Sequence, residues 1–131
     1  MNIRTLFAAA LLATSTLPAA TDGLPPIACN LKALTAEQRK QLGKLGEHVI
    51  AAISTSRDLP DGYAFRVDPT KASIVEVAQW LDIWRRCCPF YEFRIDFHAA
   101  DGSVWLAVKG RKGVKEYIPV DSPGLAAKLP K

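Results

Sequence analysis

The sequence predicts an α+β domain of two layers, in which helices pack on one face of a three-stranded, largely antiparallel sheet. Two segments repeat apolar residues at helical spacing, and three short segments alternate apolar with polar residues, as half-buried strands do. The expected order of elements is α-β-α-β-β-α. A chain of 131 residues that is 49% hydrophobic, with 8 Gly and 9 Pro, excludes a fibrous or disordered protein.

The first 20 residues have the layout of a secretory signal peptide. Residues 1–4 are a short basic start, residues 5–17 are apolar and rich in Ala, and Ala19-Ala20 offer small residues for cleavage. The apolar run is shorter than the roughly 20 residues of a membrane-spanning helix. We therefore expect a periplasmic or secreted protein without a membrane span. A second interpretation makes Cys29 a lipid-attachment site, because Ile27-Ala28 precede it.

The charge of the chain is mildly basic. Removal of the signal peptide takes away Arg4, so 16 of the 17 basic groups remain against 13 acidic groups. Lys109, Arg111, Lys112 and Lys115 are concentrated near the C-terminus, but no aromatic residues are interleaved with them. The sequence therefore predicts no nucleic-acid partner, and it points to no particular protein partner.

An extended lead-in, residues 21–34, joins the signal peptide to a single domain over residues 35–120. The lead-in contains Gly23 and two prolines and has no periodicity. Thr35 and Gln38 have the spacing of a capping box, which predicts the start of the first helix. Apolar residues then follow at helical spacing to about Thr55, namely Leu42, Leu45, Val49, Ala52 and Ile53.

A strand and a second helix come next. The run 59–62, Leu-Pro-Asp-Gly, is a turn signal, and residues 63–67 alternate as a strand does. Asp68-Pro69 predicts the start of the second helix, because aspartate caps and proline suits the first helical position. Its apolar stripe runs to Cys88, and Pro89 ends it because proline disfavours helical geometry in the residue before it.

A hairpin and a short helix complete the domain. Residues 91–97 alternate, and Asp101-Gly102 suits a two-residue turn that would pair Phe97 with Leu106 and Ile95 with Val108. Both strands then place their apolar residues on one face. Val114, Tyr117 and Ile118 predict a last short helix. The prolines beyond it predict a loose tail over residues 121–131.

The cysteines are the residues that offer chemistry. Cys29 lies in the lead-in, and Cys87-Cys88 are adjacent at the end of the second helix. Two neighbouring thiolates suit one thiophilic ion such as Hg(II) or As(III), and Cys29 could supply a third ligand. The spacing is not that of a zinc finger. The predicted metal ligands are therefore Cys29, Cys87 and Cys88, with Arg85 and Arg86 behind them as charges that favour thiolates.

Other interpretations of the same cysteines stay open. Cys88 lies on the apolar stripe, where a packed and inert thiol is common. In an oxidising compartment Cys29 could form a disulfide with Cys87 or Cys88, which leaves one thiol free in a non-catalytic structural or interaction module. A thiol-dependent enzyme is less expected, because the sequence positions no second acid or base. No cofactor other than a soft metal ion is predicted.

Three runs of residues resemble a small uncharacterised bacterial family with a Cys-Cys-Pro-Phe box. They are 84–93, which contains the box, 62–65 and 113–118. The similarity also takes in residues 29–31 and 34–35, so it covers roughly residues 28 to 118. Members sometimes occur in a heavy-metal-resistance setting, so the resemblance implies capture of a soft metal ion by thiolates. The chain departs from the family in carrying Trp84 where others carry glutamate, and in its export signal. We expect an exported protein that binds a thiophilic metal or metalloid ion.

Overall fold

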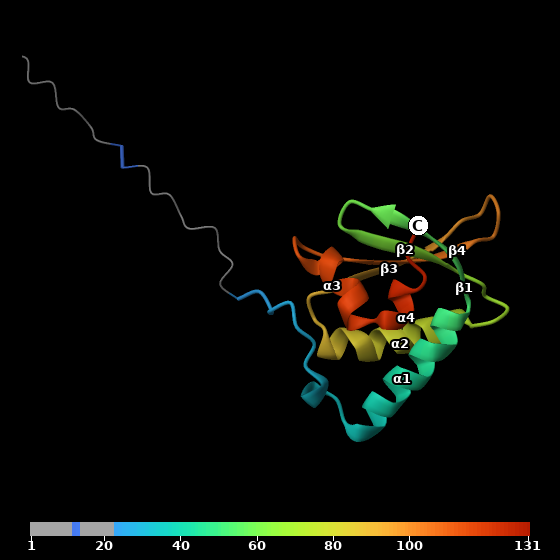
Figure 1. The fold of residues 1–131 in the computed structure, drawn as a ribbon, viewed down its shortest axis with the longest axis horizontal. Coiled ribbons are helices and arrows are strands. Elements are labelled where there is room, and N and C mark those ends of the chain that lie inside the picture. Colours follow the sequence, from blue (N-terminus) through green and yellow to red (C-terminus); the bar gives the residue numbers. More distant parts are fainter. Residues whose placement is uncertain (1–11, 14–22) are drawn as a thin grey trace, which may run out of the picture.

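The fold is seen in a computed structural model that describes residues 12–13 and 23–131, so the predicted signal peptide lies outside the described residues except at positions 12 and 13. Among the described residues no helix is long and apolar enough to cross a membrane. The elements, labelled in Figure 1, are η1 (Leu31–Ala33), α1 (Ala36–Ala51), β1 (Ile53–Leu59), β2 (Gly62–Val67), α2 (Ile74–Cys87), β3 (Glu92–Phe97), β4 (Val104–Lys109), α3 (Val114–Asp121) and α4 (Pro123–Ala126).

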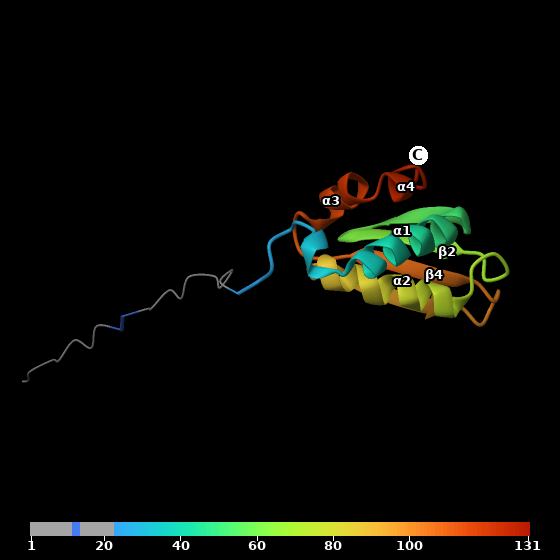
Figure 2. The same ribbon diagram turned by 90° about the horizontal axis from the view of Figure 1, so that it is seen from below.

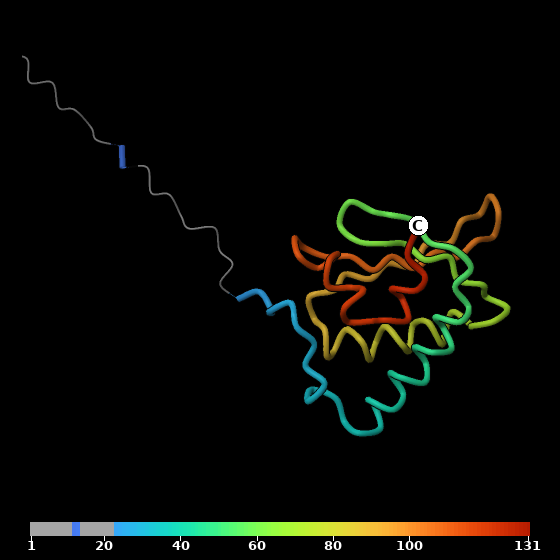
Figure 3. The backbone as a smooth tube through the Cα atoms, viewed as in Figure 1, coloured from blue at the N-terminus to red at the C-terminus, as the bar shows by residue number. Residues whose placement is uncertain are grey.

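The predicted α+β class is confirmed, but the predicted sheet of three strands is wrong. The sheet has four strands in the order β1-β2-β4-β3, and every neighbouring pair is antiparallel. It consists of two hairpins that α2 connects, as the backbone path in Figure 3 shows. In Figure 1 helices α1 and α2 lie below the strands, and in Figure 2, which is seen from below, the same two helices lie in front of them. The predicted order α-β-α-β-β-α is also wrong, because the helices and strands of the described residues follow one another as α-β-β-α-β-β-α-α after η1.

The strand that the sequence did not predict is β1, at the edge of the sheet. The first helix ends at Ala51 and not near Thr55. Ile53 is buried, as a helical stripe also requires, but the following residues of β1 are mostly exposed. A polar edge strand of this kind shows no alternation of apolar residues in its sequence. It is a strand because it pairs with β2, from Ile53↔Val67 to Leu59↔Gly62.

Capping decides where the two long helices begin. Thr35 and Gln38 form the predicted capping box, with backbone-to-side-chain bonds of 2.9 and 3.1 Å. The second helix begins later than predicted, because Ser73 caps it in a second box with Glu76. Asp68 instead accepts two hydrogen bonds within the preceding turn. A box satisfies two orphan N–H groups, whereas a single capping aspartate satisfies fewer.

The second hairpin pairs two residues away from its predicted register. Ile95 lies opposite Leu106 and Phe97 opposite Val104, because residues 98–103 form a longer loop in place of a two-residue turn. The His98 N–H donates to the Ser103 carbonyl across the base of this loop, over 2.9 Å. Since side chains alternate with a period of two, the shift leaves every side chain on its predicted face.

The C-terminal residues pack against the rest of the domain, so the predicted loose tail is wrong. Ser122 caps α4, and Leu125 on that helix is fully buried. Ser56 of β1 donates a hydrogen bond to the carbonyl of Lys128. The core between helices and sheet includes the fully buried Phe65, Leu106, Ile118 and Leu125. This packing brings the end of α3 onto the end of α2, where the cysteines lie.

Candidate thiol site

Three sulfur atoms meet at the C-terminal end of α2. Cys29 of the lead-in forms a disulfide with Cys88, and their Cα atoms are 4.5 Å apart. Cys87 is free, and its Sγ lies 3.5 Å from that of Cys88. Of the two disulfide pairings open to the sequence, this structure has the one with Cys88. Cys29 and Cys88 are therefore disulfide sulfurs in this form, and neither is a thiolate.

Backbone hydrogen bonds hold the lead-in at the end of the helix. The Cys88 N–H donates to the Trp84 carbonyl as the helix ends before Pro89. The Asn30 N–H donates to the carbonyl of Cys87 over 2.8 Å, directly beside the disulfide. On the other side of Cys29, Arg111 donates to the carbonyl of Pro25. Cys29 is thus positioned by contacts before and after it, as well as by its own bond.

Burial divides the three cysteines into one that is partly exposed and two that are buried. Cys87 and Cys88 are each 1% exposed, whereas Cys29 is only partly buried. The Cys87 thiol donates to the carbonyl of Trp84 over 3.3 Å. Burial raises the pKa of the Cys87 thiol, and the nearby carboxylate of Asp121 raises it further. Cys87 therefore stays a thiol at neutral pH, and Cys29 is the partly exposed cysteine of the disulfide.

A carboxyl group lies against the sulfur of Cys29. Asp121, the last residue of α3, places its Oδ1 3.2 Å from the Cys29 Sγ. Its Oδ2 accepts hydrogen bonds from the indole N–H of Trp84 over 3.1 Å and from the hydroxyl of Tyr91 over 3.0 Å. Burial raises the pKa of Asp121 and outweighs these two bonds, which favour the charged form. A carboxylate with a raised pKa is a stronger proton acceptor than an ordinary one.

Sequence reasoning missed Asp121, although a signal for it exists. Val114, Tyr117, Ile118 and Asp121 follow the helical spacing i, i+3, i+4, i+7, so an acidic residue continues an apolar stripe. The interruption by Pro119 led to the expectation of a tail after residue 120. In the structure α3 runs through Pro119 to Asp121, which places the carboxyl on the buried side.

Cys29 is one of the residues that line a groove of about 830 Å³, here called the disulfide groove. Helices α1 and α2 and the segment from Tyr117 to Gly124 contribute to its walls. Gly46 allows α1 to approach closely, because a Cβ there would lie 3.1 Å from the Trp80 Nε1. The groove is lined by Cys29 and Asp121, by the aromatic residues Trp80, Trp84 and Tyr117, and by aliphatic residues that include Leu42.

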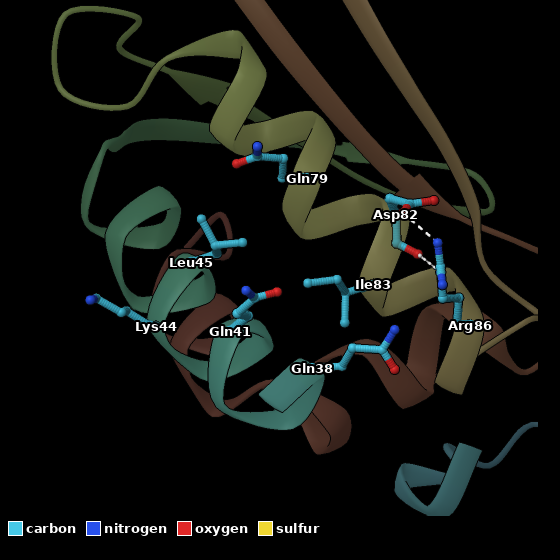
Figure 4. Close-up of a pocket in the computed structure, with 8 residues that line it drawn as sticks. All are labelled: Gln38, Gln41, Lys44, Leu45, Gln79, Asp82, Ile83 and Arg86. Carbon is cyan, nitrogen blue, oxygen red and sulfur yellow. Dashed lines mark hydrogen bonds and ion pairs between the residues drawn. The ribbon is translucent and has the colours of Figure 1, made fainter. Parts of the chain in front are cut away.

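Arg85 and Arg86, predicted to support the thiols, both bind Asp82 instead. The guanidinium nitrogens lie 2.6 and 2.8 Å from the carboxylate oxygens of Asp82, on an exposed side of α2. Arg86 and Asp82 belong to a second cavity of about 470 Å³ between α1 and α2, here called the polar hollow (Figure 4). Its lining is Gln38, Gln41, Lys44, Leu45, Gln79, Asp82, Ile83 and Arg86.

The structure brings the three predicted ligands together, but of these three only Cys87 is a free thiol. Cys29, Cys88 and Asp121 each offer one ligand atom, and these atoms lie within 4.8 Å of one another. With the disulfide formed, the two sulfurs lack the negative charge that a soft metal ion requires. Reduction would convert them into a pair of ligands beside a carboxylate. The arrangement is therefore suited first to thiol–disulfide chemistry, and to metal binding after reduction.

We compared the chain with models of protein families, with curated proteins and with solved structures, and none of the three comparisons found a match. The resemblance to the family with the Cys-Cys-Pro-Phe box therefore stays a prediction from the residues.

Proposed function

We propose that this protein exchanges its Cys29–Cys88 disulfide with the thiol of a molecule that enters the disulfide groove. One observation carries the proposal: the disulfide sulfur of Cys29, a partly exposed residue that lines the groove, touches a carboxyl group whose pKa is raised by burial. Thiol–disulfide exchange needs an accessible sulfur and a thiolate to attack it. The groove gives access to Cys29, and Asp121 is placed to take the proton from an incoming thiol.

The exchange balances without an outside oxidant. The Asp121 carboxylate accepts the proton of the incoming thiol, and the resulting thiolate attacks Cys29 Sγ. The bond to Cys88 breaks as the new sulfur–sulfur bond forms, and Cys88 leaves as a thiolate that then takes up the proton. A second thiol releases the first molecule as a disulfide and leaves Cys29 and Cys88 reduced. Each protein molecule thus oxidises two thiols once.

Burial selects Cys88 as the leaving group. An attacking thiolate reaches Cys29, because Cys88 is 1% exposed. When Cys88 leaves, the Cys87 thiol is 3.5 Å away and can donate a hydrogen bond to the new thiolate. A hydrogen bond to the charged form lowers the pKa of the leaving thiol, and a thiol of lower pKa leaves faster. The adjacent cysteines then have different roles, one in the bond and one beside it.

The experiment measures disulfide reduction by a small thiol under native conditions, with alkylation and intact-mass analysis as the readout. We expect one alkylatable thiol in the unfolded oxidised protein and three after reduction. Asp121→Asn should slow reduction at pH 6 to 7, and the difference should disappear above pH 9, where the attacking thiol ionises unaided. Asp96→Asn, on the exposed face of the sheet, is the matched control and should leave the rate unchanged.

A purely structural disulfide gives a different result. Its reduction would be limited by unfolding, so the rate would follow the unfolding rate and would not depend on which thiol is used. Equal rates for the wild type and Asp121→Asn across the pH range, together with unfolding-limited reduction, would sink the exchange proposal. The domain would then be the structural or interaction module with a Cys29 disulfide.

Capture of a thiophilic metal or metalloid ion is the second candidate, and one observation favours it. Ligand atoms of Cys29, Cys88 and Asp121 lie within 4.8 Å of one another, and a further sulfur, that of Cys87, is 3.5 Å from Cys88. Reduced protein mixed with Hg(II) or arsenite should develop thiolate charge-transfer absorption. The oxidised protein is the control and should not. An unchanged spectrum and melting temperature of the reduced form would remove this candidate.

Export to the periplasm or the medium is part of the proposal. A disulfide persists in oxidising compartments, and residues 1–20 have the layout of a signal peptide. The mass of the protein recovered from a secreting cell should lack those residues. Recovery of the full-length chain in a reducing cytoplasm would contradict this part.

A further inference from the structure

The disulfide groove carries negative charge on a protein that is basic as a whole. Among the described residues that line it, Glu47 and Asp121 are acidic and none is lysine or arginine. The whole chain, in contrast, has 17 basic and 13 acidic residues. Arg39 also lies on α1, but its guanidinium donates to the carbonyls of Leu31 and Leu34 and does not line the groove. The groove therefore matches a ligand of positive charge.

Asp121 lacks a cation among its contacts in the described part of the chain. Its Oδ2 is bound by two neutral donors, the indole of Trp84 and the hydroxyl of Tyr91, and its Oδ1 lies against the Cys29 sulfur. Burial of a carboxylate without a cationic partner costs free energy, which is why its pKa is raised. A cation in the groove would offset that cost. The carboxylate of Asp121 could therefore form one further interaction, an ion pair with a cationic ligand.

The rest of the groove is apolar and open. Trp80 and Trp84 stack with their ring centroids 4.8 Å apart and form one wall. Leu31 and Val120, which also line the groove, are 53% and 71% exposed. A Cβ added at Gly43 of α1 would meet nothing within 4 Å. An opening of about 830 Å³ has the size of a small-molecule site, and its exposed aliphatic side chains would gain from being covered.

We propose that the disulfide groove binds an apolar cation, a molecule with a protonated or quaternary amine and a hydrophobic body. The amine is held by the carboxylates of Asp121 and Glu47, and the body lies against Trp80, Leu42 and Val120. Combined with the proposed disulfide exchange, on which this step rests, the same recognition makes cationic thiols the preferred substrates. Anionic thiols are repelled by the two carboxylates.

The binding experiment uses full-length mature protein and three probes without a thiol: benzyltrimethylammonium, benzyl alcohol and benzenesulfonate. Tryptophan fluorescence and NMR shifts of the groove residues follow the titration. We expect the cation to bind about tenfold more tightly than the anion, with the alcohol between them and with weakening at high salt. Glu47→Gln and Asp121→Asn should each reduce the preference. Equal binding of cation and anion would overturn the proposal.

A blocking variant tests the location. Gly43→Leu places a side chain in open space in the groove and replaces a glycine within a helix, so the protein should keep its fold and melting temperature. It should lose most of its affinity for benzyltrimethylammonium. Gln41→Leu, on the same helix but lining the polar hollow, is the matched control and should bind normally. Undiminished binding by Gly43→Leu would overturn the assignment. Binding that falls as protein concentration rises would also do so, because a second copy of the chain would then be the occupant.

The exchange experiment separates the two proposals. Reduction of the disulfide is compared for cysteamine, a cationic thiol, and 3-mercaptopropionate, an anionic one, at equal thiolate concentration. Cysteamine should react faster, and Gly43→Leu should remove the difference. If both thiols react at the same rate, that rate exceeds the unfolding rate and the cationic probe does not bind, the substrate class is wrong while exchange stands. If the probe binds but neither thiol reacts under native conditions, exchange is wrong while the cation site stands.

Discussion

The disulfide groove and the polar hollow are both lined by side chains of α1 and α2, yet their carboxyl groups are in opposite states. In the polar hollow, Asp82 is exposed, and hydrogen bonds from Arg85 and then Arg86 hold its pKa below the ordinary value. In the disulfide groove, burial raises the pKa of Asp121, whose described partners are neutral. An aspartate carboxylate is therefore paired with cations in the polar hollow, and an aspartate carboxylate has neutral hydrogen-bond donors as its described partners in the disulfide groove.

This difference explains why only one cavity is a candidate site. In the polar hollow, Asp82 and Arg86 are already paired with one another and are exposed to water, so a ligand has little to gain from them. The disulfide groove combines a partly exposed disulfide cysteine, a carboxylate without a cation among its described partners and uncovered aliphatic side chains. The charge, pairing and exposure of the lining groups, more than the volume of the cavity, therefore make the disulfide groove a candidate site.

The largest predicted effect on the free energy of unfolding is that of removing the disulfide, which lies at the disulfide groove and not at the polar hollow. It joins residues 59 positions apart, so replacing both cysteines, Cys29→Ala with Cys88→Ala, should lower the free energy of unfolding by about 2–5 kcal/mol. Urea denaturation measures this loss. Cys87→Ala keeps the disulfide and should cost about 1 kcal/mol, as loss of one buried sulfur does. A double variant as stable as Cys87→Ala would mean that the disulfide does not hold the lead-in in place.

A smaller effect should appear in the pH dependence of stability. The native pKa of Asp121 is raised above its ordinary 3.8, so between those two values the folded state binds more protons than the unfolded state. Its contribution to stability is therefore largest at low pH and is lost as pH rises through the native pKa. Asp121→Asn should remove this loss, so the variant should gain stability relative to the wild type between pH 4 and pH 7, as urea denaturation at each pH measures. Parallel pH profiles for the two proteins would contradict the assignment.

The smallest effect belongs to the polar hollow. Gln41 is exposed on α1, and its side chain makes no described hydrogen bond. Gln41→Ala should change the free energy of unfolding by no more than about 0.5 kcal/mol, because alanine is also a good helix former. The rate of disulfide reduction should stay the same, as measured by alkylation over time. A marked change in that rate would show that the two cavities are coupled through α1.

The parts of the fold that could be predicted from sequence are those encoded by local spacing. The capping box of Thr35 and Gln38, the end of α2 before Pro89 and the apolar face of the second hairpin each depend on residues within a few positions of one another. The edge strand β1 could not be predicted in this way. Its residues are polar, and its neighbour β2 supplies the pairing that makes it a strand.

The candidate site divides along the same line. The sequence drew attention to the three cysteines, because adjacent cysteines and a third in the lead-in are rare residues in an unusual pattern. It could not choose between Cys87 and Cys88 as the partner of Cys29, since the two differ by one position. Asp121 reaches Cys29 across 92 residues, and only the packing of α3 brings the two together. Proximity in sequence predicts that Arg85 and Arg86 support the thiols, but both guanidinium groups bind the carboxylate of Asp82.

The position of two cysteines side by side at the end of α2 has a consequence for biosynthesis. During synthesis Cys29 emerges first, and the thiols of Cys87 and Cys88 become available to it later, one after the other. A disulfide between Cys29 and Cys87 would use the buried thiol that is free in the folded protein and would leave Cys88 unpaired. The protein should therefore mature faster in cells that contain a disulfide isomerase.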